Sequence, residues 1–207
     1  MICKSIATVA LAFLSASAFA GDVYILGSVG QASTKINKTD LDNSLVNAGV
    51  TGLSSSTKET DTAYKLQLGY QFNQYFAVEG GYVNLGEAKY SASFTGGNGK
   101  ATAKVDGWNI DAVGILPLND QFSLFGKLGT FAAHTKVDAS ASGPGGAASV
   151  SDSANNWSTH YGVGASYAFT KSVAVRVEYE KFDRVGKDNS TGKADVDLWS
   201  VGVAYKF

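Results

Sequence analysis

Six charged residues fall on the polar side of segments in which apolar and polar residues alternate. They are Lys65, Glu79, Asp111, Lys127, Arg176 and Glu178. If that side is enclosed, each charge needs an opposite charge, because an unpaired buried ion costs several kcal/mol. Three bases and three acids on one side are therefore typical of an internal network of ion pairs.

A serine and a histidine form the one arrangement that suggests catalysis. Ser158 precedes His160 by two positions, so both fall on the same face of a strand. Nucleophilic catalysis by such a pair needs a third orienting group, and no motif marks one. Residues 96–100 (Gly-Gly-Asn-Gly-Lys) have the wrong spacing for a phosphate loop, and the acids show no calcium-loop register. We therefore predict no catalytic residue, no metal and no cofactor.

The elements that carry these side chains have a two-residue period, which is typical of strands with two different faces. The last segment is the clearest, with Trp199, Val201, Val203, Tyr205 and Phe207 opposite Ser200, Gly202, Ala204 and Lys206. Seven further segments behave similarly, at about 23–32, 60–72, 75–85, 102–116, 121–133, 157–169 and 172–182. Eight antiparallel strands can close into a small barrel without a free edge.

The connections between these segments alternate in length. Tight turns are expected at 73–74, 117–120 and 170–171. Long polar stretches, expected as loops, lie at 33–59, 86–101, 134–156 and 183–194. Short turns at one end and long loops at the other are typical of outer-membrane barrels, with the turns in the periplasm and the loops outside the cell.

The first 20 residues have the features of a secretory signal peptide. Lys4 is the basic residue, 6–14 is a short apolar stretch, and Ala18-Phe19-Ala20 is a small-x-small cleavage site. We expect cleavage after Ala20 and a mature barrel over 21–207. Cys3 is the single cysteine of the chain, so the mature part has no thiol or disulfide.

Composition excludes several classes of protein. The formal net charge is −1, and it becomes −2 once Lys4 is removed, so no basic field exists to attract nucleic acid. No segment after the leader is apolar enough to form a membrane helix, so this chain would have to span a membrane as a closed barrel. The 24 glycines, 10 tyrosines and 11 phenylalanines against 2 prolines favour strands and turns.

Alternation alone leaves open which face is enclosed, since a secreted soluble barrel would enclose the apolar face. The charged face also carries many glycines and serines, which suit a narrow interior. The apolar face carries aromatic residues near the strand ends, where membrane interfaces favour them. These are Tyr64, Tyr70, Phe72, Tyr82, Trp108, Tyr167, Tyr179, Trp199, Tyr205 and Phe207. We predict that the apolar face contacts lipid.

The chain resembles the transmembrane domain of OmpA-like outer-membrane proteins. The similarity is densest over 69–82 and 85–86, and it continues over 125–129, 175–179 and 199–207. The resemblance implies an all-β fold, an eight-stranded antiparallel transmembrane barrel in the bacterial outer membrane. Relatives of OmpA often carry a further periplasmic domain that binds peptidoglycan, and we do not expect this function here because the sequence stops at Phe207.

The resemblance also assigns roles to particular residues. It places Glu79, Lys127, Arg176 and Glu178 on positions that form an interior salt-bridge network in the family, which has been proposed to act as a gate. Val113 stands where a lysine is expected and Ser166 where an acid is expected, and Asp111 is our candidate for the missing acid. Tyr205 and Phe207 match the aromatic strand end that the barrel assembly machinery reads.

Three classes of function follow from these features. The first is a structural surface protein, with diffusion of small solutes or ions through a plugged lumen. The second is an adhesin or virulence-type antigen that acts through its long loops. The third is a lipid-modifying enzyme that would use Ser158 and His160 at the lipid-facing rim. The expected partners are outer-membrane lipids, lipopolysaccharide, the assembly machinery and a host-cell or phage ligand at the loops. We expect a monomer and no nucleic-acid partner.

Overall fold

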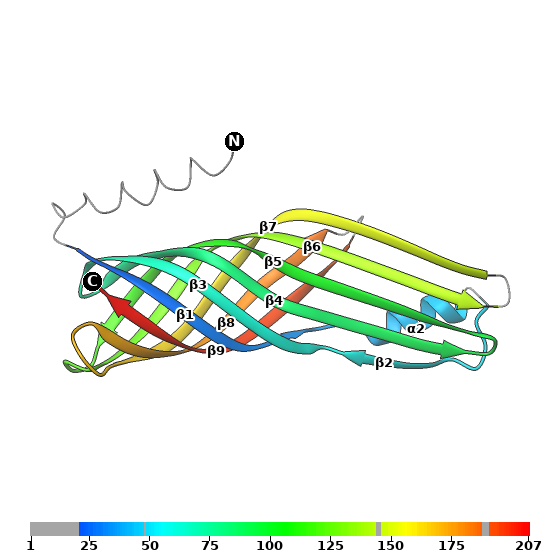
Figure 1. The fold of residues 1–207 in the computed structure, drawn as a ribbon, viewed down its shortest axis with the longest axis horizontal. Helices are drawn as coiled ribbons and strands as arrows, with labels where there is room; N and C mark the ends of the chain where they lie inside the picture. The colour runs from blue at the N-terminus through cyan, green and yellow to red at the C-terminus, as the bar shows by residue number, and fades with distance from the viewer. Residues whose placement is uncertain (1–20, 48, 144–145, 188–190) are drawn as a thin grey trace.

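The computed structural model describes residues 21–207 except 48, 144–145 and 188–190 (Figure 1). The expected signal peptide lies outside the described residues. The elements in chain order are β1 (Asp22–Thr34), α2 (Lys38–Asn47), β2 (Ser54–Lys58), β3 (Thr60–Asn73), β4 (Phe76–Phe94), β5 (Gly97–Pro117), β6 (Phe122–Gly143), β7 (Gly146–Ala168), β8 (Val173–Lys187) and β9 (Gly192–Lys206).

Eight of the strands form a closed antiparallel ring. Neighbours pair in the order β4-β3-β1-β9-β8-β7-β6-β5, and β4 pairs with β5 to close the ring. The short strand β2 precedes β3 and pairs with β4 beyond the point where the pairing of β3 with β4 begins. The prediction of an eight-stranded antiparallel barrel is confirmed.

Three tight connections lie at one end of the barrel, which we call the turn end, together with the start of β1 and the end of β9 (Figure 1). Each connection is held by a side chain at its start. Asn73 accepts hydrogen bonds from the backbone N–H groups of Tyr75 and Phe76, and Asn119 accepts them from those of Gln121 and Phe122. Asparagine and threonine side chains form such local bonds readily, which is why they occur in turns.

The opposite end differs from the expectation of long loops. Pairing of β4 with β5 continues to Phe94–Gly97, that of β6 with β7 to Gly143–Gly146, and that of β8 with β9 to Lys187–Gly192. The segment 33–59 contains α2 and β2. The alternation is weak here because both faces carry small or polar residues: the buried side of β4 holds Ala88, Tyr90 and Ala92, whereas 146–153 are exposed on both faces. We call 87–94, 97–105, 134–143 and 146–155, together with β2, the outer ribbon.

The wall of the barrel has an exposed apolar face and a buried polar face. Val29, Leu66, Leu128 and Val163 point outward and are about 60% exposed. The charged residues of the opposite face are buried in the lumen. An apolar exterior around a charged interior is the arrangement of a membrane barrel, and it is the reverse of a soluble carrier.

Aromatic side chains form two groups on this exterior. Phe72, Phe169 and Phe207 lie at the turn end, each with its ring edge against a tyrosine. Tyr82–Trp108 and Tyr179–Trp199 pair further along the barrel, with ring centroids 5.6 and 4.8 Å apart. Among the described residues, no helix is long and apolar enough to cross a membrane.

Candidate functional site

The lumen holds charged residues between two apolar clusters. Along β8, the inward residues Arg176, Glu178 and Glu180 are followed by Phe182. Phe182 belongs to a buried apolar cluster that we call the ribbon-side cap, composed of Ala32, Ala63, Val83, Leu85, Val105, Phe131, Ala133, Phe182, Val185, Val196 and Leu198. A second cluster, the turn-side cap, contains Tyr24, Leu26, Ala77, Val113, Phe125 and Ala204. The inward residues of β6 repeat the pattern, because Lys127 lies between Phe125 and Phe131.

Glu79 lies where the charged layer meets the turn-side cap. Its two carboxylate oxygens accept hydrogen bonds from Arg176 (2.5 Å), Lys127 (2.9 Å) and the hydroxyl of Tyr24 (2.6 Å). The Arg176 guanidinium also lies 4.0 Å from the ring centroid of Phe125, within the range of a cation–π contact. Two cations and a hydroxyl together satisfy the carboxylate of Glu79, which is fully buried.

Two lysines join the acids of β8 into one network. Lys127 lies 3.2 Å from Glu178 and 3.4 Å from Glu180, in addition to its contact with Glu79. Lys65 contacts both Glu178 and Glu180. Arg176 approaches Glu178 at 3.1 Å. Each of the three permanent cations therefore contacts at least two carboxylates.

His160 connects this network to Asp111. Its Nδ1 lies 2.8 Å from Asp111 and its Nε2 lies 3.1 Å from Glu180, while Asn109 donates to the other oxygen of Asp111. A neutral imidazole has one N–H, so one of the two carboxylates would then face a lone pair. The doubly protonated ring donates to both acids, and it also balances the four lumen carboxylates against the three permanent cations.

The five residues predicted to form the network all lie in the lumen, but they do not form one directly bonded set. Glu79, Lys127, Arg176 and Glu178 contact one another, whereas Asp111 joins them through His160 and Glu180. The prediction placed Lys65 on the enclosed side without assigning it to these five, and it missed Glu180, His160 and Tyr24 as members. The strand parity that selected the others also places Lys65, His160 and Glu180 inward, so this signal was present in the sequence.

The departures from the family pattern have identifiable surroundings. Val113 packs in the turn-side cap, and Ser166 lies opposite Arg176 in the β7–β8 ladder. A cavity of about 190 Å³ at the turn end is lined by Ser166, Lys171, Glu79 and Arg176, among others. Val113 therefore contributes to an apolar layer. Val113 and Ser166 both line a short cavity that ends at the charged layer.

The serine and histidine considered for catalysis do not meet the geometry of a catalytic pair. Both are buried in the lumen and not at the lipid-facing rim. Ser158 bonds to Asn156 and to the carbonyl of Arg184, while both ring nitrogens of His160 contact carboxylates. Within the described part of the chain, no cluster of His, Cys, Asp and Glu is arranged to hold a metal ion.

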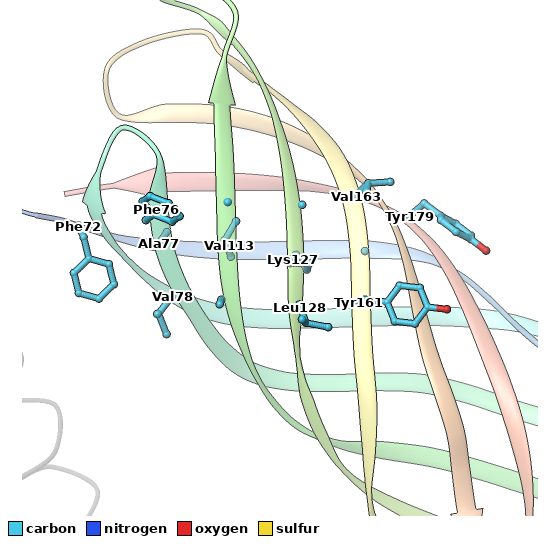
Figure 2. A pocket seen from close by; sticks show the side chains of 14 residues that line it. Phe72, Phe76, Ala77, Val78, Val113, Lys127, Leu128, Tyr161, Val163 and Tyr179 are labelled. Carbon is cyan, nitrogen blue, oxygen red and sulfur yellow. The ribbon is translucent and has the colours of Figure 1, made fainter.

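The outer wall carries a shallow apolar groove near the turn end (Figure 2). Its floor includes Gly114 and Gly126, where an added Cβ would make only ordinary van der Waals contact, 4.0 and 3.8 Å from a backbone oxygen. Phe72, Val78 and Leu128 extend away from the wall around the groove. Lys127 precedes Leu128 on β6, and its side chain turns inward. The groove is almost entirely apolar, so it is a surface for hydrocarbon and not for a polar ligand.

The outer ribbon is attached to α2 by hydrogen bonds to the half-buried carboxylate of Asp42. The hydroxyl of Tyr90 in β4 donates to the carboxylate of Asp42 in α2 at 2.6 Å. Hydrogen bonds from Ser55 and Tyr90 lower the pKa of Asp42. This contact keeps the segment between β1 and β2 against the ribbon.

Known proteins share this fold and sequence. Residues 19–207 match the family model of the OmpA-like transmembrane domain. Outer membrane protein A of Salmonella typhi is 34% identical over 140 residues, covering 67% of this chain and 38% of that protein. The chain therefore spans well under half the length of this relative.

Two solved structures resemble the barrel. Neisserial surface protein A has a TM-score of 0.52 and 16% identity, with 89% of this chain and 97% of that chain covered. OprG from Pseudomonas aeruginosa has a TM-score of 0.50 and 16% identity, with 91% and 96% covered. At this level of identity, the two structures support the fold alone.

Proposed function

The chain belongs to the family of OmpA-like transmembrane domains and is an outer-membrane β-barrel surface protein, and from this premise we propose that it acts as a closed barrel that holds the outer ribbon at the cell surface. The observation that carries this proposal is the layered lumen. A charged network between two buried apolar clusters leaves no continuous polar path along β6 and β8. In this proposal the barrel has a structural role, and the outer ribbon makes the contacts with other molecules at the cell surface.

Conductance in planar bilayers tests the closed state. The refolded mature chain should give no steady channel current, because an ion that enters the cavity at the turn end would still have to cross the charged layer and the apolar ribbon-side cap. Arg176→Ala should not create a steady current either, since the ribbon-side cap remains intact in this variant. Frequent, uniform opening of the unmodified protein would contradict a closed lumen.

Slow ion passage through a switching network is the second candidate function. It is favoured by the contacts of Lys127 with Glu79, Glu178 and Glu180, because a cation among three acids can exchange partners. In the bilayer experiment this candidate predicts rare, brief events that Arg176→Ala changes in frequency. Identical traces for the two proteins would remove it.

We also propose that Tyr205 and Phe207 form the assembly signal. Both face outward on β9, with ring centroids 5.1 Å apart, and Phe207 is 75% exposed. The pair Tyr167–Phe169 has nearly the same geometry on β7, with centroids 5.0 Å apart and Phe169 62% exposed. This pair therefore offers a matched control at the same end of the barrel.

Phe207→Ala should reduce the heat-modifiable, membrane-inserted protein in cells severalfold, whereas Phe169→Ala should leave it near the unmodified amount. The reason is that a signal depends on position in the chain, while lipid contact is shared by both rings. Quantitative gels of outer-membrane fractions measure this difference. An equal reduction in the two variants would indicate that the aromatic ring contributes only through its lipid contact.

The remaining expected partners and activities follow from surface chemistry. We propose that outer-membrane phospholipid and lipopolysaccharide contact the apolar exterior, including the groove over Gly114 and Gly126. We further propose that the protein is not an enzyme. This is supported by Ser158 and His160, whose hydrogen bonds are taken by other groups, so neither is poised as a nucleophile or base.

A further inference from the structure

The strand β7 loses its neighbour on one side halfway along its length. It pairs with β8 from Ala168–Ala174 to Thr159–Asp183, whereas its pairing with β6 continues to Gly143–Gly146. In Figure 1, β8 and β9 end well before the tips of β6 and β7. Within the described residues, no strand pairs with the outer side of 146–158, so this stretch is an edge of the ribbon.

Side-chain bonds hold the point where the two strands separate. Arg184 in β8 has a φ of 51°, a left-handed conformation that turns β8 away from β7. Asn156 donates to the carbonyl of Arg184 at 3.1 Å and accepts from the N–H of Gly186 at 2.9 Å. The N–H of Arg184 is bonded to Asp195 at 3.0 Å. The separation is therefore built into the fold, and the edge begins directly beyond Asn156.

The backbone of this edge has a defined direction. The N–H of Ser153 bonds to the side chain of Asp152 at 2.8 Å, so it does not point toward β6. Backbone groups alternate in direction along an antiparallel strand, and the β6–β7 register is continuous over this stretch. Ala147, Ser149, Ser151, Ser153 and Asn155 therefore direct their N–H and C=O groups away from β6.

The edge has few of the features that usually block strand addition. Residues 146–155 contain no lysine or proline and a single charged residue, Asp152; the ladder has no bulge there, and 146–153 are exposed on both faces. The opposite edge of the ribbon is protected, since β2 has five residues and ends in Lys58. Proteins normally shorten or charge an exposed edge to prevent pairing with other chains.

We propose that residues 146–155 of β7 bind an extended polypeptide segment of another protein, which adds to the outer ribbon as its next strand. A row of N–H and C=O groups at strand spacing is complementary to a second peptide backbone, and it is not complementary to a sugar or an acyl chain. The small side chains of the edge give the partner room and impose little sequence preference. The biological role of this binding rests on the proposed display of the ribbon at the cell surface.

A peptide with the sequence of residues 134–143 is the probe, because this segment of β6 already matches β7 in an antiparallel ladder. Binding of the fluorescent peptide to the refolded mature chain in detergent is measured by anisotropy. The variant Ser149→Pro/Ser151→Pro removes two outward N–H groups and leaves the backbone bonds to β6, while the hydrogen bond of the Ser151 side chain to Asp138 is lost in this variant and in its control alike. The matched control is Ser149→Ala/Ser151→Ala, which keeps the backbone intact.

The proline variant should bind at least tenfold more weakly than the unmodified chain, and the alanine variant should bind equally well. Hydrogen exchange on the unmodified chain gives a second measurement, which does not depend on how the proline variant folds. The peptide should slow exchange at the outward amides of 147–155 and leave the amides bonded to β6 unchanged. Absence of peptide binding, equal binding by the proline variant, or protection elsewhere would each overturn the proposal. Because the protein is in detergent, these results do not depend on conductance or on display at the cell surface.

Discussion

Glu79→Ala should lower the free energy of unfolding by about 3–5 kcal/mol, the usual cost of removing one partner from a buried ion pair. The loss is large because Glu79 accepts bonds from Arg176, Lys127 and Tyr24, all within 2.9 Å. Its removal leaves two cations to share Glu178 and Glu180 with Lys65. Urea titration of the barrel refolded in lipid vesicles measures the change.

A matched control separates burial from charge. Lys104 forms an ion pair with Glu87 at 3.6 Å, and its side chain is 58% exposed. Lys104→Ala should therefore change the free energy of unfolding by less than about 1 kcal/mol. Similar losses for the two variants would show that water reaches Glu79, and the lumen would then not be closed at the charged layer.

The charged layer also shows how far sequence alone leads. Strand parity placed Glu79, Lys127 and Arg176 on one enclosed side, because a two-residue period is a property of every strand. It did not give their partners, since contacts across a lumen depend on the register of eight strands at once. His160 illustrates this limit: its two acids come from β5 and β8, and neither is near it in the sequence.

Glycine positions in the lumen were similarly ambiguous from sequence. Gly69 appears as a gap on the polar side of β3, yet the ring of Tyr24 lies directly against it, and an added Cβ would sit 2.1 Å from that ring. The space left by Gly69 lets the Tyr24 ring lie across the lumen so that its hydroxyl bonds to Glu79. The sequence shows the glycine, but the aromatic ring that needs the space is on another strand.

The outer ribbon was the main error of sequence reasoning, and its cause is physical. Amphipathic alternation requires two different environments, whereas 146–153 are exposed on both faces and the buried side of β4 holds only Ala88, Tyr90 and Ala92 within the ribbon. Its strands are specified by backbone pairing that continues from the wall, and serine, threonine and alanine are compatible with it. The edge of β7 begins where Arg184 takes a left-handed conformation and Asn156 bonds to Arg184 and Gly186, and no pattern in the sequence identifies this point.

Phe182→Ala should open the ribbon-side cap and destabilise the barrel by about 3–5 kcal/mol, the range for a buried Phe→Ala change. The Phe182 ring stacks on His160 with centroids 4.2 Å apart and meets the edge of Phe131 at 5.0 Å. Its removal exposes His160 to the ribbon side and leaves a void that water can enter. Urea titration measures the stability.

Bilayer recordings of the same variant test whether the cap is the barrier to ions. Phe182→Ala should increase the frequency of current events, because it opens the apolar layer on the ribbon side, while a cavity already reaches Glu79 and Arg176 from the turn end. Phe72→Ala removes the same atoms from the outer wall, where the ring is 53% exposed, and should leave the recordings unchanged. If Phe182→Ala lowers stability but conducts no better, the barrier must lie at Phe125 and Arg176, where the guanidinium packs on the ring.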